Sequence, residues 1–228
     1  MSVSVVIPVW GDPALTDACL AALNATAPGV EVVVIDNTGM YRLPEGVTAT
    51  HLLPQAENLG CTGAKILGVE KSHGDIVIFM DCDTVAQPEW LEALLPAFDN
   101  PEVGMAGPKL IYPTGAIQCA GVRTWHGNGS AGGENRKDEH ASNDDETGCT
   151  GASMALRRSV YNEVGGIDPN FRNAYDDCDL DMAVLEAGYK IAYRENSVVI
   201  HHESSTGPER WHFAAEAVAY MNAKWGHR

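Results

Sequence analysis

Short apolar runs alternate with amphipathic stretches along the first half of the sequence. Four runs rich in Val, Ile and Leu have the length of strands and end at polar or turn residues: 2–9, 30–35, 48–53 and 75–80. Between them, residues 14–25 and 60–72 show the spacing of amphipathic helices. Strands that are apolar throughout and alternate with helices predict an α/β fold with a mostly parallel central sheet, flanked by helices on both faces.

The second half continues this pattern with one interruption. The predicted helices and strands are 88–98 (helix), 103–110 and 152–156 (strands), 180–187 (helix), 190–193 and 198–201 (strands), and 209–224 (helix). Residues 123–148 break the pattern, because glycines mixed with polar residues leave few apolar positions. We predict a flexible loop there that orders on substrate binding. Since core-like sequence resumes directly after it, we expect one domain over residues 1–228.

The acidic balance of the chain narrows its possible partners. There are 15 Lys and Arg against 31 Asp and Glu, which gives a formal net charge of −16. Such a surface repels phosphate backbones and anionic lipid, so nucleic-acid binding is disfavoured. No signal peptide and no apolar run of about eighteen residues is evident, so no integral membrane segment is predicted. The six cysteines form no CxxC pair and no zinc spacing, which predicts free thiols and a cytoplasmic location.

Asp81-Cys82-Asp83 is the sharpest local feature of the sequence. Its two carboxylates directly follow the apolar run 75–80, and Asp36 directly follows the run 30–35. Ligands of parallel sheets bind just beyond the carboxyl ends of the strands. A hard divalent cation takes carboxylate oxygens and shares its coordination shell with substrate phosphates. An Asp-x-Asp triplet by itself is more often a solvated turn, but its position here favours a metal site.

Three further segments could contribute to the same cleft. The acidic run from Tyr175 to Asp181 either caps a helix or supplies a general base. His201 and His202 follow a short apolar run, where an imidazole is either a structural side chain or, with carboxylates, a ligand for a manganese-like metal. The segment 58–65 contains glycines that permit close backbone approach, but it lacks the spacing of the dinucleotide and triphosphate loops.

In their order along the chain, these segments resemble the family 2 glycosyltransferases with the GT-A (Rossmann-like) fold, in particular the bacterial rhamnosyl- and glucosyltransferase-like members. The resemblance covers nearly the whole chain outside 123–148. The segments that carry it are Val5-Val-Ile-Pro-Val-Trp10, Val33-Val-Ile-Asp36-Asn, Asn58-Leu-Gly-Cys-Thr-Gly-Ala-Lys65, Met80-Asp-Cys-Asp-Thr84, Gly151-Ala-Ser-Met-Ala-Leu-Arg-Arg158, Val164-Gly-Gly-Ile-Asp168, Phe171 through Asp179, Ile200-His-His-Glu-Ser204 and Lys224-Trp225-Gly226. Each segment alone is weak evidence, whereas the ordered set is specific.

The resemblance implies a role for individual residues. It assigns residues 1–110 to a nucleotide-sugar-binding half and 111–228 to an acceptor and catalytic half. Asp83 is the expected metal ligand, and Asp81 is expected to contact either the donor's ribose or the metal. His201 is the preferred second metal ligand, with His202 as the alternative. Asp177 aligns with the catalytic carboxylate, and Asp176 is the alternative base because the family usually has Glu-Asp at this pair. The expected donor-site residues are Pro8, Val9, Trp10, Asp36 (on the base), Asn58, Gly60, Lys65, Asp81, Cys82 and Asp83.

The reaction implied by the resemblance is a transfer with inversion at the anomeric carbon, assisted by Mn²⁺ or Mg²⁺. The donor would be a UDP-, dTDP- or GDP-linked sugar, and the acceptor a glycan, a lipid-linked compound or another hydroxyl compound. A sugar nucleotidyltransferase is one alternative, although residues 9–13 lack the basic side chains expected to hold a triphosphate. The other alternative is a non-catalytic nucleotide- or carbohydrate-binding module of the same fold. Such a module would not need the carboxylates Asp83 and Asp177.

Overall fold

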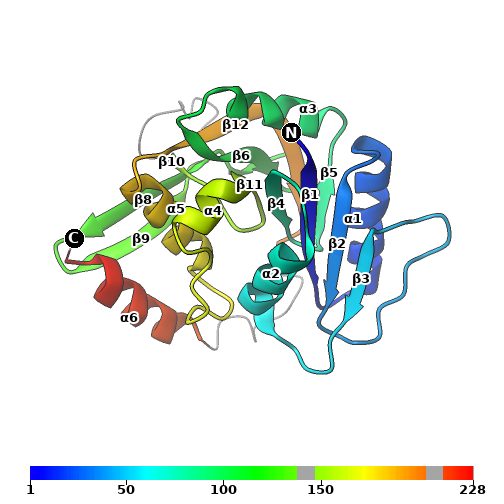
Figure 1. The fold of residues 1–228 in the computed structure, drawn as a ribbon, viewed down its shortest axis with the longest axis horizontal. Coiled ribbons are helices and arrows are strands. Elements are labelled where there is room, and N and C mark those ends of the chain that lie inside the picture. The colour runs from blue at the N-terminus through cyan, green and yellow to red at the C-terminus, as the bar shows by residue number, and fades with distance from the viewer. Residues whose placement is uncertain (138–146, 204–212, 228) are drawn as a thin grey trace.

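A curled central sheet with helices on both faces forms the body of the protein (Figure 1). The structure is a computed structural model that describes residues 1–137, 147–203 and 213–227. The elements of the first half are β1 (Val3–Val9), α1 (Pro13–Thr26), β2 (Glu31–Asp36), β3 (His51–Pro54), α2 (Gly60–Lys71), β4 (Ile76–Met80) and β5 (Thr84–Ala86). Those of the second half are α3 (Trp90–Leu94), the 3₁₀-helix η1 (Leu95–Asp99), β6 (Val103–Ile111), β7 (Ile117–Cys119), β8 (Val122–Gly127), β9 (Ser130–Asn135), β10 (Thr147–Gly148), β11 (Ser153–Arg157), α4 (Arg158–Glu163), α5 (Asp176–Glu186), β12 (Lys190–His201) and α6 (Ala214–Trp225).

The strand order of the central sheet is β3-β2-β1-β4-β11-β6-β12-β5, with β7 beside β6. Strands β3, β2, β1 and β4 run parallel, as do β6 and β12. Strand β11 is antiparallel to both β4 and β6, and so joins the two parallel groups. The α/β architecture predicted from the sequence is confirmed. The carboxyl ends of β1, β2 and β4 meet at one edge, where the polar residues of the sequence motifs follow.

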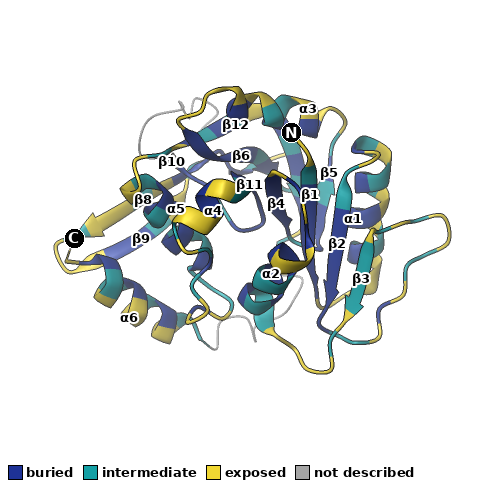
Figure 2. Cartoon of the chain, in the orientation of Figure 1, coloured by how far each residue is buried: buried dark blue, intermediate teal, exposed yellow. Residues whose placement is uncertain are grey.

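Alternating side chains of the buried strands fill two cores, one on each face of the sheet. In β1, Val5 and Ile7 pack with Leu20 of α1 and Trp90 of α3. The intervening Val6 belongs to the other core, beneath α2, α4 and α5. Figure 2 shows the central strands buried along most of their length. This two-sided burial explains why the strands are apolar throughout rather than alternating.

Several helices and strands differ in extent from the sequence predictions. The runs 190–193 and 198–201 belong to the single strand β12, whose register shifts between Arg194 and Val198. The predicted helix 88–98 is a short α3 continued by η1, because Pro96 has no backbone N–H for an α-helical hydrogen bond. Helix α5 begins at Asp176, earlier than the predicted 180, and α6 begins at Ala214. Residues 209–212 of the last predicted helix lie outside the described residues.

The described part of the predicted flexible loop 123–148 contains regular strands, and its ordering on substrate binding stays a prediction. Strands β8 and β9 form a regular antiparallel hairpin, and β10 pairs with β8. Glycines in this hairpin permit close packing: a Cβ on Gly132 would lie 2.8 Å from the Trp125 ring, and one on Gly133 would lie 2.8 Å from Sγ of Cys178. Composition suggested a loop because these glycines replace the apolar residues usual in strands. Residues 138–146 lie outside the described residues.

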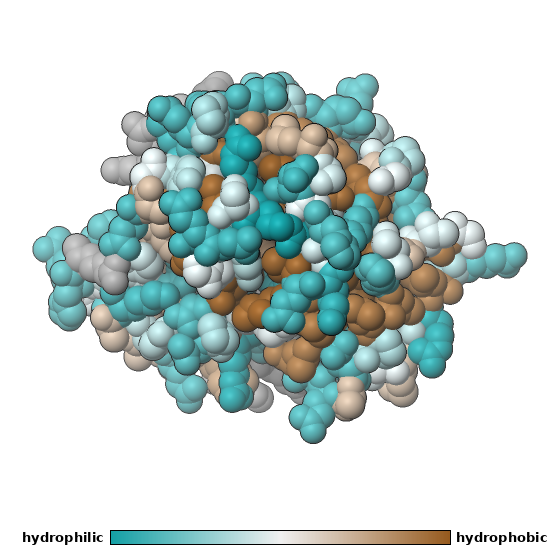
Figure 3. All heavy atoms as spheres, viewed as in Figure 1, coloured by the Kyte–Doolittle hydropathy of each residue, from teal (hydrophilic) through white to brown (hydrophobic). Residues whose placement is uncertain are grey.

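The displayed surface (Figure 3) is mostly hydrophilic, and the cysteines are unpaired. Figure 3 shows mostly hydrophilic side chains on the face that it displays, with an apolar area below its centre. All six cysteines are free thiols, as predicted. Among the helices that the structure describes, none has the length and apolar character needed to cross a membrane.

Candidate active site

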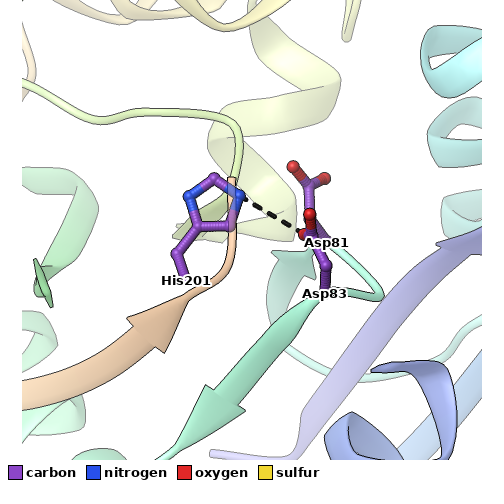
Figure 4. Close-up of side chains that lie close together, drawn as sticks. All are labelled: Asp81, Asp83 and His201. Atoms are coloured by element: carbon purple, nitrogen blue, oxygen red, sulfur yellow. Dashed lines mark ion pairs between the residues drawn. The ribbon is translucent and has the colours of Figure 1, made fainter. Parts of the chain in front are cut away.

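Three side chains with metal-ligating atoms meet at the carboxyl edge of the central sheet. Asp81 and Asp83 lie in the turn between β4 and β5, and His201 ends β12, where it pairs with Thr84 of β5. One ligand atom of each of the three residues lies within 4.8 Å of the others. Figure 4 shows the imidazole directed toward the carboxylates, with Nε2 of His201 3.3 Å from Oδ1 of Asp83. Two carboxylates and an imidazole are a suitable donor set for Mn²⁺ and related divalent cations.

The ionisation of this cluster reflects burial and close negative charge. Burial raises the pKa of Asp81 to about 6; the Lys65 charge opposes this shift, and Asp83 adds to it. Burial alone would lower the pKa of His201, but the hydrogen bond to Asp83 and the charges of Asp81 and Asp83 outweigh it, so this pKa is raised. The neighbouring carboxylates contribute to both shifts, although burial is the larger cause at Asp81, and a bound cation would offset this negative charge.

Of the doubled histidine, His201 lies with the aspartates and His202 does not. Successive side chains of a strand point in opposite directions, and the ring of His202 is exposed. The backbone N–H of His202 donates to the carbonyl oxygen of Asp83 at 3.0 Å. The backbone therefore fixes the turn that carries Asp83 against the end of β12, while only one imidazole reaches the cluster.

A cavity beside the cluster contains most of the predicted donor-site residues. Trp10 lines this cavity and has an exposed fraction of 39%, so part of its side chain is accessible to a ligand. Cys82 is buried beneath it, with Sγ 3.4 Å from the carbonyl oxygen of Trp10. The full lining is Pro8, Trp10, Asn37, Asn58, Gly60, Cys61, Asp81, Cys82, Asp83, Asn173 and His201.

Three predicted donor-site residues, Val9, Asp36 and Lys65, do not line this cavity, and Lys65 lines the second cavity instead. Val9 is 2% exposed and packs in the core. Asp36 is fully buried: its Oδ1 accepts the backbone N–H of Thr38, and its Oδ2 that of Tyr41, both at 2.9 Å. The Asp36 carboxylate thus holds the loop after β2, and its neighbour Asn37 lines the cavity. A contact between Asp36 and a nucleotide base stays a prediction.

The start of α2 is built from amide side chains and one glycine. Gly60 has a φ of +73°, and a Cβ there would lie 3.0 Å from the carbonyl oxygen of Arg172. The carboxamide oxygen of Asn173 accepts the N–H of Cys61 at 2.9 Å, and that of Asn58 accepts the N–H of Gly60 at 2.8 Å. Glycine is required because side chains rarely adopt this backbone conformation and because the neighbouring chain is close.

A second cavity also reaches the cluster, through Asp81 and His201, and is lined by the start of the acidic run, Tyr175 to Cys178. Asp176 is buried and its Oδ2 lies 2.9 Å from Nζ of Lys65, whose side chain is 3% exposed. Burial alone would lower the pKa of Lys65, but nearby negative charge, Asp176 first, raises it well above its usual value. The lining comprises Cys61, Lys65, Asp81, Gln118, Val122, Gly133, Asn135, Thr150, Gly151, Ala152, Asn173, Ala174, Tyr175, Asp176, Asp177, Cys178, His201 and Glu203.

Asp177 differs from Asp176 in its partners. No lysine or arginine pairs with it among the described ion pairs; its oxygens accept the backbone N–H groups of Gly151 at 2.7 Å and Cys178 at 2.9 Å. Burial and then the neighbouring charge of Asp176 raise the pKa of Asp177. Tyr175, just before this pair, has a φ of +65°, a strained conformation for a residue with a side chain. A carboxylate with a raised pKa in a cavity is suited to accept a proton.

The remaining acids of the run have structural partners. Nε1 of Trp225 donates to Oδ1 of Asp179 at 2.7 Å, and Lys224 bridges Asp179 and Asp168. These contacts attach α6 to the start of α5. Asp181 is fully buried, and both its oxygens lie 3.0 Å from the N–H of Cys149.

Asp181→Asn is expected to stabilise the protein at neutral and alkaline pH by about 0.5–2 kcal/mol. Burial raises the pKa of Asp181 well above its usual value. For a carboxyl with a raised folded-state pKa, stability is highest below the unfolded pKa and falls as pH rises. Asparagine carries no charge, so the variant should escape this loss. Urea unfolding between pH 4 and pH 8 would measure it, and a wild-type advantage that grows with pH would contradict the expectation.

The structure brings to the site further side chains that the sequence did not single out, among them Asn37, Asn173, Gln118 and Glu203. Asn37, Asn173 and Glu203 lie within recognised segments, so their positions could have indicated them. Gln118 and Glu203 line the second cavity from β7 and from the residues after β12. Gln118 lies outside every recognised segment, and neither residue is marked by a pattern of apolar positions.

The chain that carries this sheet edge, its two cavities and the acidic cluster matches a known family over more than half of its length. The family description Glycosyl transferase family 2 matches residues 4–165, and the chain belongs to that family. It is 29% identical over 148 residues to the O-antigen biosynthesis protein RfbC of Myxococcus xanthus, covering 60% of this chain and 12% of RfbC. It is 25% identical over 221 residues to N-acetylglucosaminyl-diphospho-decaprenol L-rhamnosyltransferase of Mycobacterium tuberculosis, covering 82% of this chain and 72% of that protein.

Solved structures share the fold. The mannosyltransferase PcManGT from Pyrobaculum calidifontis, in complex with GDP-Man and Mn²⁺, aligns with a TM-score of 0.67 and 16% identity, over 97% of this chain and 63% of that one. GalNAc-T7 with UDP, GalNAc and Mn²⁺ aligns with a TM-score of 0.67 and 17% identity, over 88% of this chain and 43% of that one. The GT-A fold is therefore confirmed. The chain spans 24% of the length of a relative from Sinorhizobium fredii and 42% of the pre-mycofactocin glycosyltransferase of Mycobacterium tuberculosis.

Proposed function

We propose that the chain is a metal-dependent, inverting glycosyltransferase that moves a sugar from a nucleoside-diphosphate donor to an acceptor hydroxyl. The observation that carries this proposal is the position of Asp81 and His201, which line both cavities at once. A donor in the first cavity would place its diphosphate at the cluster, and an acceptor in the second would approach from the side of Asp177. Membership of the family supports this assignment, as do the structural relatives solved with GDP-Man and Mn²⁺ and with UDP, GalNAc and Mn²⁺.

Asp81, Asp83 and His201 would hold the metal ion. A divalent cation bound there would neutralise the charge that develops on the departing diphosphate. Trp10 would contact the nucleoside, and the amides of Asn37 and Asn58 would contact its polar groups in the first cavity. The donor's base is one of uracil, thymine or guanine under this proposal.

Asp177 would remove the proton from the acceptor hydroxyl as that oxygen attacks the anomeric carbon. Its backbone hydrogen bonds to Gly151 and Cys178 fix the carboxylate in the second cavity. Asp176 is held by Lys65, so it would balance the buried lysine charge rather than take the proton. The attack occurs from the face opposite the leaving diphosphate, which inverts the anomeric configuration. The acceptor would be a glycan, a lipid-linked glycan or another hydroxyl compound.

Donor turnover is the direct test of the proposed function. The protein would be incubated with UDP-, dTDP- and GDP-linked sugars and Mn²⁺, and release of nucleoside diphosphate would be measured with and without a metal chelator. We expect release from one nucleotide class, abolished by chelation. Release of pyrophosphate from a nucleoside triphosphate and a sugar phosphate would instead indicate a sugar nucleotidyltransferase. Binding of a nucleotide sugar without turnover, across a panel of acceptors, would indicate a non-catalytic module.

A further inference from the structure

A chain of hydrogen bonds runs from the second cavity to the metal-ligating cluster. The hydroxyl of Tyr112 donates to Oε2 of Glu203 at 2.9 Å, and Nε2 of Gln118 donates to the same oxygen at 3.2 Å. Oε1 of Gln118 lies 2.7 Å from Nδ1 of His201. Nε2 of His201 in turn faces Asp83 at 3.3 Å. Each of these contacts joins residues far apart in the sequence, so the chain exists only in the folded protein.

The Glu203 carboxylate determines how the Gln118 amide is oriented. A carboxylate only accepts hydrogen bonds, so the Gln118 atom facing it must be the NH₂ group. The reverse orientation would place two oxygens in contact with no proton between them. Tyr112 holds Glu203 from the other side, and the positive φ of Glu203, +35°, fixes where its side chain leaves the backbone. The amide therefore presents its oxygen to His201.

The orientation of Gln118 determines which nitrogen of His201 carries the proton. An amide oxygen only accepts, so Nδ1 of the neutral imidazole must be the donor. In the neutral ring Nε2 then carries the lone pair, and this is the nitrogen directed at Asp83 in Figure 4; when the ring is protonated, both nitrogens donate, Nδ1 to Gln118 and Nε2 to Asp83. Gln118 is 3% exposed and His201 is 8% exposed, so water competes little for this hydrogen bond.

We propose that Gln118, itself oriented by Glu203, is a positioning residue that holds His201 with its proton on Nδ1 and so presents Nε2 as a metal ligand. An imidazole ligand generally donates its second N–H to a polar partner that fixes its tautomer and orientation. Here that partner is an amide whose own orientation is determined by a carboxylate of the second cavity. The inference rests on the metal site proposed above, and it gives Glu203 a role without contact to the metal.

The first test measures the tautomer in the metal-free protein, which needs no catalytic activity. Histidine would be labelled with ¹⁵N, and long-range ¹H–¹⁵N correlation spectra recorded at a pH high enough to neutralise the ring. A His201→Gln variant identifies the signal. We expect the proton of His201 on Nδ1 in the native protein, and on Nε2 in a substantial fraction of Gln118→Leu molecules. A proton on Nε2 in the native protein would overturn the proposal, as would an unchanged tautomer in Gln118→Leu.

The second test measures Mn²⁺ affinity by calorimetry and by the electron paramagnetic resonance signal of free Mn²⁺. Gln118→Leu should bind Mn²⁺ about 10–100-fold more weakly. Gln118→Glu should also bind weakly, because its carboxylate would face that of Glu203. The double variant Gln118→Glu with Glu203→Gln restores a donor and an acceptor at each contact, so it should recover most of the native affinity. Failure of the double variant to improve on Gln118→Glu, with both folded, would refute the paired role.

Gln87→Leu is the matched control for these variants. It removes the same amide from a position where Nε2 donates to the carbonyl oxygen of Val85, away from both cavities. Its Mn²⁺ affinity and His201 tautomer should equal those of the native protein. If the native protein binds no Mn²⁺, the proposed metal site fails, and the tautomer measurement still decides whether Gln118 orients His201.

Discussion

Asp177→Asn is expected to lower the rate of glycosyl transfer by about 10²–10⁴-fold, the usual contribution of a general base. Asparagine has the same shape but cannot accept the proton of the acceptor hydroxyl. Its amide oxygen can still accept one of the two backbone N–H groups that Asp177 accepts, so the fold should persist. Transfer would be followed under single-turnover conditions with saturating donor, and nucleotide affinity by calorimetry. That affinity should be close to native.

Asp176→Asn is the companion variant for this experiment. It leaves Lys65 buried beside a neutral side chain, which should cost about 3 kcal/mol of stability. At a temperature where both variants are folded, Asp176→Asn should retain far more activity than Asp177→Asn. The reverse ranking would assign the base to Asp176, and native turnover in Asp177→Asn would remove Asp177 from the role.

Asp83→Asn is expected to weaken Mn²⁺-dependent nucleotide binding by about 10²–10³-fold. The neutral amide oxygen would replace a charged ligand of the proposed metal site, and the interaction of the metal with the diphosphate would be worth several kcal/mol. The pKa values of Asp81 and His201 should fall as well, because the negative charge of Asp83 raises both of them. Calorimetry of nucleoside diphosphate binding, with and without Mn²⁺, separates the metal-dependent part of the affinity.

The matched control is Asp99→Asn, the same substitution at an exposed carboxylate of η1. Its binding should be indistinguishable from that of the native protein. If Asp83→Asn lost affinity equally in the presence and absence of metal, the carboxylate would act on the nucleotide or the fold directly, and its assignment as a metal ligand would fail.

The parallel half of the sheet could be predicted from the sequence because its strands are buried on both faces. Uniform apolar runs such as 75–80 are typical of that environment, and they end where the chain reaches the binding edge. The position of Asp81 and Asp83 at that edge follows from strand direction alone. Bringing His201 to the same edge required the recognised order of segments, because nothing local indicates which strand β12 joins.

Other features depend on contacts that a linear pattern does not encode. The β8–β9 hairpin uses glycines for close packing on Trp125 and Cys178, so its composition resembles a loop. The ion pair of Lys65 with Asp176 is what distinguishes Asp176 from Asp177, and Lys65 is more than a hundred residues distant in sequence. Gln118 and Glu203 are polar residues on short or terminal segments, and only the assembled hydrogen bonds connect them to His201.

Strand β12 lies late in the chain yet pairs with β5 and β6, which lie far before it in the sequence. Such pairing closes a long loop, and loop closure of this kind is slow relative to local structure. The three residues of the cluster can meet only after this strand has docked, since His201 is its last residue. Acquisition of metal affinity during refolding would therefore report one of the last steps, completion of the sheet, rather than the early formation of its parallel half.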